Sequence, residues 1–282
     1  MSNETKWDII IKSKVGLFEI NIKEIFYYRD LIWLFVKRDF VIFYKQTILG
    51  PLWYIIQPLI NTLVFTIIFG KLANISTDGI SPFLFYLAGN VVWGYFAVCL
   101  TTTSTTFLTN SNIFGKVYFP RLTVPIANVL FSLLQFFIQF TIFLIFLIYY
   151  KTIGFDLKLN LSVLMLPLIL IQIALLSLGI GILISSLTVK YRDLTFVMNF
   201  GIQLWMFATP IVYPMSIIPE KYRLLISLNP MTAVVETFRK IFLGESSIEI
   251  IHILISVLMT IIIIFLGLIN FNRVEKNFMD TI

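Results

Sequence analysis

The stretch RDLIWLFVKRDFVIFYKQTILGPLWYIIQPL, residues 29–59, decides how the rest of the chain is arranged. It begins as a charged, aromatic-rich segment, breaks at Leu49-Gly50-Pro51, and continues without charge until Lys71. On a helical wheel most of the charged side chains share one arc, and apolar side chains lie opposite. The charged arc holds Asp30, Lys37, Arg38 and Lys45, and the apolar arc holds Ile32, Phe35, Val36, Ile42 and Phe43. The pattern predicts a helix over residues 22–47 that lies in a membrane interface with its apolar side toward the lipid.

Two features limit this interpretation. Asp39 falls on the apolar side of the wheel, so the separation of charge from apolar surface is incomplete. An ordinary basic segment beside a membrane span, obeying the positive-inside rule, explains the same lysines and arginines. Both readings predict a Gly-Pro corner followed by a helix that enters the membrane.

The composition is that of a polytopic membrane protein. The chain has 282 residues, of which 59% are hydrophobic and 13% charged, with a mean hydropathy of +0.93. A soluble domain cannot bury that much apolar surface. A single Cys and a single His exclude a disulfide within the chain and a Cys/His metal set. Lys and Arg are scattered between apolar stretches, so no nucleic acid is expected as a partner.

Six stretches are long and apolar enough to cross about 30 Å of hydrocarbon as helices. They are residues 52–70, 83–103, 124–150, 161–189, 194–213 and 250–271. The predicted fold is therefore all-α, with a cytoplasmic lead-in and interface helix over residues 1–51 and a six-helix transmembrane domain over residues 52–282. Lys and Arg favour one side by roughly two to one, which places both termini in the cytoplasm.

The region between the last two spans, residues 214–249, has a different pattern. Pro210, Pro214 and Pro219 interrupt the exit from the fifth span. Two semi-apolar segments follow, residues 222–228 and 231–243, separated by the helix breaker Asn229-Pro230. Both are too short to span, so they are predicted to be short helices that dip into the outer edge of the bilayer. An amphipathic hairpin on the surface is the alternative.

The loop TNSNIFGKVYFPRLTVP, residues 109–125, lies on the cytoplasmic side between the second and third spans. Its Asn/Ser start and Pro120 predict a brief helix between them. Aromatic side chains protruding from such a helix would fit a socket on a soluble partner. The alternative is an ordinary connecting loop, which leaves exposed aromatics unexplained.

The sequence lacks the groups that most kinds of active transport and catalysis require. The six predicted spans contain no Asp, Glu, Lys or Arg, which argues against ion-coupled transport. The chain has no G-x-x-x-x-G-K-[S/T] phosphate loop and no evident nucleophile-base set, so it is predicted not to be an enzyme. Energy for active work would have to come from another chain.

Uncharged amides recur in the spans instead. They are Gln57, Asn61, Asn90, Asn128, Gln135, Gln139, Gln172, Asn199 and Gln203. Together with aromatic faces they could line a path for a hydroxyl-rich polymer. They could equally form hydrogen bonds from helix to helix. The strip Ser177-xxx-Gly181-xxx-Ser185 predicts a close contact between two helices.

Four segments in this order resemble the membrane subunit of a type-2 ABC exporter for polysaccharides. They are residues 34–59, 112–125, 190–194 and 210–231. This family exports lipid-linked O-antigen, capsule or teichoic-acid chains, and the resemblance is closest to its O-antigen branch. It implies a homodimer that binds two copies of a separate ATPase subunit, which holds ATP and Mg, with no cofactor in this chain.

The resemblance also implies roles for particular residues. Coupling to the ATPase falls on Ile113, Phe114, Lys116, Tyr118, Phe119 and Arg121. The interface helix and the place where a lipid pyrophosphate headgroup enters fall on Lys37, Arg38, Lys45, Leu49 and Gly50. The outer gate falls on Tyr222, Asn229, Pro230, Glu236 and Arg239.

The function implied is export of lipid-linked polysaccharide across the bacterial inner membrane by a multi-pass subunit. The cargo expected is O-antigen linked to undecaprenyl pyrophosphate. Export of teichoic acid, capsule, a small lipid or a drug by the same architecture is one alternative. A passive channel or a structural membrane protein is another.

Overall fold

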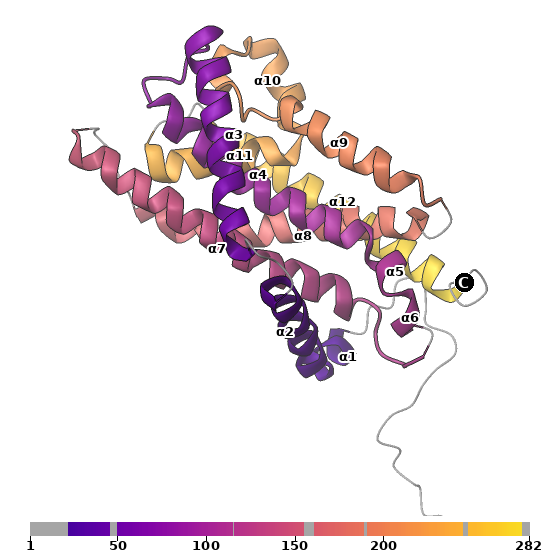
Figure 1. The fold of residues 1–282 in the computed structure, drawn as a ribbon. Helices are drawn as coiled ribbons and strands as arrows, with labels where there is room; N and C mark the ends of the chain where they lie inside the picture. Colours follow the sequence, from indigo (N-terminus) through magenta and orange to yellow (C-terminus); the bar gives the residue numbers. More distant parts are fainter. Residues whose placement is uncertain are drawn as a thin grey trace, which may run out of the picture.

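The computed structural model describes residues 22–45, 50–114, 116–154, 161–188, 191–244 and 248–277, and the regular structure in these ranges is helical. The chain starts with α1 (Ile22–Tyr27) and α2 (Arg29–Lys45), which lie at one end of the bundle (Figure 1). A 3₁₀ turn η1 (Gly50–Leu52) leads into α3 (Trp53–Phe65), which continues as a π-helix η2 (Thr66–Leu72). The predicted Gly-Pro corner is therefore present, although Leu49 lies outside the described residues.

Long helices and short connecting helices alternate in the rest of the chain. The long ones are α4 (Pro82–Ser104), α7 (Thr123–Thr152), α8 (Leu166–Thr188) and α12 (Ile250–Asn277). The shorter ones are α5 (Thr106–Thr109), α6 (Ser111–Phe114), η3 (Leu161–Met165), α9 (Leu194–Ala208), η4 (Met215–Ile217), α10 (Glu220–Ser227) and α11 (Pro230–Leu243). Figure 1 shows α10 at the opposite end of the bundle from α6.

Within the described ranges, five helical segments are long and apolar enough to cross a membrane, by length and composition. They are Trp53–Leu72, Pro82–Ser104, Thr123–Thr152, Ser162–Thr188 and Ile250–Arg273. The sixth predicted span, residues 194–213, is not confirmed, because α9 has 15 residues and ends at Ala208. An α-helix of that length reaches about 22 Å, less than the hydrocarbon thickness of about 30 Å. The extended backbone of Thr209, followed by Pro210, ends this helix.

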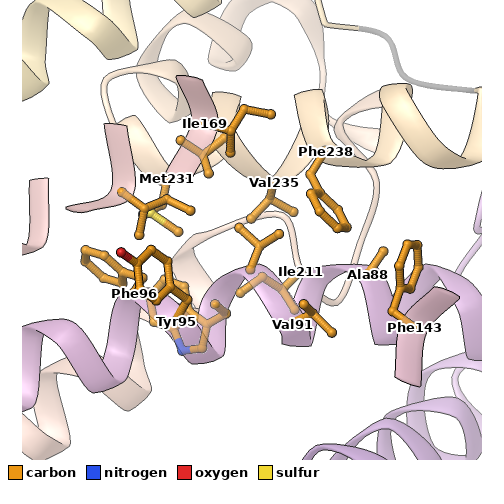
Figure 2. Packing of buried hydrophobic residues seen from close by; sticks show 14 of the residues in the cluster. Ala88, Val91, Tyr95, Phe96, Phe143, Ile169, Ile211, Met231, Val235 and Phe238 are labelled. Atoms are coloured by element: carbon orange, nitrogen blue, oxygen red, sulfur yellow. The ribbon is translucent and has the colours of Figure 1, made fainter. Parts of the chain in front are cut away.

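Helix α4 forms the centre of the bundle. Most of its membrane-length window, 78%, is buried, whereas the corresponding share for the other four segments is 33% or less. It packs against α3, α7, α8 and α11, and Figure 2 shows its side chains Ala88 and Val91 facing side chains of α11. A helix that is apolar on all sides is stable only when neighbours surround it, which fits this position.

Small residues allow α8 to approach its neighbours closely. A Cβ at Gly181 would lie 2.5 Å from Thr103 Cβ of α4, so only glycine fits there without a shift. Next to it, Ser185 Oγ accepts a hydrogen bond from the Phe107 amide, and Thr188 Oγ1 donates to the Ser104 carbonyl. The predicted close contact along the strip that includes Gly181 and Ser185 is confirmed.

A second close approach joins α8 to α12. A Cβ at Gly267 would lie 2.5 Å from the Gly179 carbonyl oxygen, and a Cβ at Gly179 would lie 2.8 Å from Ile264 Cα. Both obstacles are backbone atoms, which cannot turn aside as a flexible side chain can. The sequence-based analysis did not single out this pair.

Replacing Gly267 tests whether this contact supports the bundle. Gly267→Ala is expected to cost about 1–3 kcal/mol, because the added methyl group separates the two backbones. Gly201→Ala is the matched control, since a Cβ there meets nothing within 4 Å and the helix gains propensity. Thermal unfolding in detergent measures both variants. Equal melting temperatures for the two would contradict a tight α8–α12 contact.

Candidate functional site

Part of the apolar side of α2 packs against the protein. Ile32, Phe35 and Val36 are buried, whereas Ile42 of the same predicted arc is 45% exposed and Phe43 is half-buried. The three buried side chains belong to a cluster at the end of the bundle where α2 lies, which we call the end cluster (Figure 1). Its other buried members are Phe107, Phe114, Phe119, Leu122, Val124, Ala127, Ile182 and Phe271. The prediction that this side of the helix faces the membrane is therefore wrong for Ile32, Phe35 and Val36, and it stays a prediction for Ile42.

The outward side of α2 is both apolar and basic. Trp33 and Leu34 have 68% and 60% of their surface exposed, and Lys37 and Lys45 are exposed beside them. Asp39, which did not fit the wheel, accepts a hydrogen bond from Arg38 Nε at 2.8 Å. The Arg38 guanidinium also lies 4.9 Å from the centre of the Phe35 ring. The charges of Arg38 and Asp39 therefore balance each other at the edge of α2 that faces the bundle.

Stacked rings hold the corner between α2 and α3. Phe43 near the end of α2 lies parallel to Tyr54 at the start of α3, with ring centres 4.5 Å apart. Phe43 also meets Phe131 of α7 edge to face. Gly50, predicted as part of the headgroup site, has a φ of 38° and is buried, a backbone conformation that glycine adopts without strain.

The loop after α6 has an aromatic interior and an exposed tip. Phe114 and Phe119 have 5% exposure each, and their rings lie 5.5 Å apart within the end cluster. Phe119 also contacts Phe35 of α2 at 5.8 Å. The prediction of protruding aromatics is thus wrong for these two rings, because Phe119 packs against α2 and Phe114 packs between Phe107 and Phe119.

The remaining members of the predicted coupling set are more accessible. Lys116, Val117 and Tyr118 are exposed, and Ile113 and Arg121 are half-buried. Tyr118 Oη lies 3.5 Å from a Glu24 carboxylate oxygen of α1, at the limit of a hydrogen bond. The structure therefore joins α1, α2 and this loop into one surface at one end of the molecule.

The amides of the spans divide into two groups. On α4, α7 and α8 they are buried or half-buried, and three of them make hydrogen bonds between helices: Asn90 Nδ2 donates to Thr62 Oγ1 at 2.9 Å, and Gln172 Nε2 donates to Ser256 Oγ at 2.6 Å. Asn128 donates to Thr106 Oγ1 of α5 in the same way. For Asn90, Asn128 and Gln172 the prediction of helix-to-helix hydrogen bonds is confirmed. Gln135 and Gln139 of α7 are also buried, but their Oε1 atoms have no hydrogen-bond partner in the described part of the chain, so for these two it stays a prediction.

The amides of α3 and α9 are exposed instead. They are Gln57, Asn61, Asn199 and Gln203. Helix α9 runs along the edge of the bundle and buries only Ile202 among its described residues (Figure 1). Polar side chains at membrane depth face water or another protein surface, because lipid offers them no hydrogen bond. These faces of α3 and α9 are therefore the candidates for a polar path or a protein contact.

The two short helices predicted near the outer edge are present as α10 and α11. Tyr222 of α10 is 49% exposed. In α11 every residue except Lys240 is buried, and the helix packs against α12, α4 and α8. Figure 2 shows Val235 and Phe238 of α11 above α4 in the core. The alternative of a surface hairpin is therefore wrong for α11.

Asn229 organises the start of α11. Its side-chain oxygen accepts from the Met231 amide and from Trp205 Nε1, both at 3.1 Å, and its amide nitrogen donates to Thr209 Oγ1 at 2.9 Å. The Ser256 hydroxyl donates to the Pro230 carbonyl at 2.7 Å. Trp205 and Thr209 were not predicted from the sequence as partners of Asn229. Both lie within five residues before Pro210, where the helix ends, and this position could have indicated them.

Glu236 and Arg239 lie on the same side of α11, one turn apart. Their side chains form an ion pair of 3.1 Å between Glu236 Oε1 and Arg239 Nη1, with 3% and 1% of their surface exposed. Both residues are thus inside the protein and not on an outer gate surface. Within the described residues, no group of three or more His, Cys, Asp or Glu side chains is arranged to hold a metal ion.

Comparison with known proteins gives matches along most of the chain. Residues 30–243 match the family model described as "ABC-2 type transporter". The chain is 30% identical over 257 residues to an O-antigen export system permease protein RfbA of Klebsiella pneumoniae, covering 90% of this chain and 95% of that protein. It is 23% identical over 223 residues to the protein of the same name from Myxococcus xanthus, covering 78% and 83%.

The end cluster can be tested with two neighbouring substitutions. Phe114→Ala is expected to cost about 3–5 kcal/mol, because it removes a buried ring between Phe107 and Phe119. Val117→Ala, at a 60% exposed position in the same loop, is expected to leave stability unchanged. Melting temperatures of the purified variants compare the two. A Phe114→Ala protein as stable as Val117→Ala would contradict the packing described.

Proposed function

The chain belongs to the ABC-2 type transporter family, and on that premise we propose that it is the membrane-spanning subunit of an ATP-driven exporter of lipid-linked polysaccharide, with O-antigen as the cargo. The observation that carries the proposal is the similarity, along nearly the whole chain, to permeases named for O-antigen export. Five apolar helices make it a multi-pass membrane protein, and the bacterial inner membrane is its proposed location.

ATP hydrolysis is assigned to a separate partner. The sequence has no phosphate loop, so two copies of an ATPase subunit would hold ATP and Mg. The surface formed by α1, α2 and the loop after α6 is the proposed contact with that partner. In it, the exposed Lys116 and Tyr118 make the contact, while Ile113, Phe114, Phe119 and Arg121 support the loop from behind.

A second copy of the chain is the proposed neighbour of α3 and α9. The two helices expose amides together with large apolar side chains, among them Phe196, Phe200 and Ile60. Such a mixture suits a path for a polymer with hydroxyl groups and apolar ring faces, formed between two copies. Helix α9 with the segment that follows it would be the sixth crossing, which leaves both termini in the cytoplasm.

The outward side of α2 is proposed to meet the lipid headgroup. The exposed Lys37 and Lys45 each contribute on the order of 1 kcal/mol toward an anionic surface, whereas Arg38, the third predicted headgroup residue, is paired with Asp39. Trp33 and Leu34 next to them suit the boundary between headgroups and acyl chains. Gly50 at the corner and Leu49 before it would mark where the pyrophosphate headgroup enters.

Deleting this subunit tests the cargo. We expect surface O-antigen to disappear and lipid-linked glycan to accumulate on the cytoplasmic side, as measured by glycan staining of intact and disrupted cells. If a capsule or a teichoic acid is lost instead, that polymer is the cargo and O-antigen is not. Unchanged surface glycans would reject polysaccharide export in favour of a small lipid or drug, a passive channel or a structural role.

The partner contact has its own test. The double substitution Lys116→Glu/Tyr118→Ala is expected to lower ATP hydrolysis by the reconstituted complex about tenfold, because it reverses a charge and removes a ring from the contact surface. Leu224→Ala, exposed on α10 at the other end of the bundle, is the control and should hydrolyse ATP normally. Normal hydrolysis by the double variant would exclude this loop from coupling.

A further inference from the structure

The segment after α9 releases backbone carbonyls inside the protein. Helix α9 ends at Ala208, and Thr209 has the extended ψ of 142°. From there the chain runs without an α-helix to α10, through Pro210 and Ile211. Carbonyl groups released from a helix in an apolar bundle need new hydrogen-bond donors. Figure 2 shows Ile211 between α4 and α11, so water cannot supply them freely.

Arg239 supplies both donors. Its Nη1 donates to the Pro210 carbonyl at 2.5 Å, and its Nη2 donates to the Ile211 carbonyl at 2.7 Å. Nη1 also donates to Glu236 Oε1, so the positive charge is balanced by a carboxylate of the same helix. Because a buried charge without a partner is costly, these three acceptors determine where the guanidinium lies.

Helix α4 completes the surroundings of the guanidinium. The Arg239 Cζ lies 3.6 Å from the centre of the Phe85 ring, within the range of a cation–π interaction. A Cβ at Gly89 would lie 3.0 Å from Arg239 Nη2 and 3.0 Å from Ile211 Cγ2. Gly89 thus leaves the space that the guanidinium and the connecting segment share.

Two carbonyl oxygens, one carboxylate oxygen and an aromatic face are the ligands of a cation site. We propose that α4, α11 and the segment after α9 build such a site and that Arg239 fills it permanently, as the positioning residue that fixes the outer end of α9. In ion-coupled transporters, carbonyls of interrupted helices hold the coupling ion. Here a tethered guanidinium takes that place, so the site needs no ion from solution.

The contacts predict chemical rescue. All of them involve Nη1, Nη2 or Cζ, and among the residues that the structure describes Arg239 Nε has no hydrogen-bond partner. A free guanidinium ion can therefore make the same contacts once the side chain is removed. Arg239→Ala is expected to lower the melting temperature of the purified exporter, and millimolar guanidinium chloride should recover at least half of that loss relative to equal sodium chloride.

Arg223→Ala is the matched control. Arg223 of α10 also donates to a backbone carbonyl, that of Ile218 at 3.0 Å, but it is only half-buried. Its removal leaves an open surface, so guanidinium should produce no gain in melting temperature. The same absence of gain for Arg239→Ala would overturn the proposal.

A second variant separates the carbonyl contacts from the ion pair. Glu236→Gln/Arg239→Met removes both charges and keeps the volume, so it is stable if Arg239 serves only to balance Glu236. We expect this variant to remain destabilised and to lose most export, because the Pro210 and Ile211 carbonyls lack donors. If the double variant is as stable and exports as well as the unaltered protein, the proposal is overturned. This test remains valid even if Arg239→Ala does not fold.

The role in export rests on the proposed function, whereas the melting temperatures do not depend on any cargo. If guanidinium rescues Arg239→Ala but deletion of the protein leaves surface glycans unchanged, the proposed cargo is wrong and the proposed cation site stands. If deletion removes the surface glycan but guanidinium does not rescue Arg239→Ala, the proposed cation site is wrong and the proposed cargo stands.

Discussion

An apolar bundle must provide a hydrogen-bond partner for every backbone group released where a helix is interrupted. The end of the bundle that holds α10, opposite α6, is arranged around that constraint (Figure 1). Arg239 serves the carbonyls after α9, Asn229 caps α11, and Ser256 Oγ donates to the Pro230 carbonyl. Arg239 and Thr209 are therefore buried beside the place where the chain is interrupted, and Arg239 and Asn229 each satisfy backbone groups there.

The other end of the molecule depends on aromatic packing. The end cluster joins α2, the loop after α6, α7 and α12 through rings such as Phe35, Phe119 and Phe271. Closely packed interiors transmit displacement because they have few voids. A displacement of the exposed tip of the loop would therefore reach α2 and the neighbouring ends of α7 and α12 together.

Local patterns predicted much of this arrangement. Proline and Asn229 marked α10 and α11 nearly to the residue, and the wheel identified the buried side of α2. The errors concern length and surroundings. Counting uncharged residues extended the span of α9 to residue 213, although the helix ends at Ala208. The pattern of the cytoplasmic loop predicted protruding aromatic side chains, although Phe114 is buried beside Phe107 and Phe119. The helical wheel also placed Asp39 correctly on the side of α2 that faces the bundle. It could not predict that Arg38 would be the residue that balances the charge of Asp39.

Composition and periodicity by themselves determined that this is an all-helical membrane protein, where most helices begin and end, and which of their sides are apolar. These properties are local, since turn residues and side-chain spacing act within a few residues of the chain. The tertiary structure alone decided what covers each apolar side: the bundle for part of α2 and for α11, and none of the described residues for much of α3 and α9. Lipid and protein are equally apolar to a side chain, so only the packing of distant segments distinguishes them.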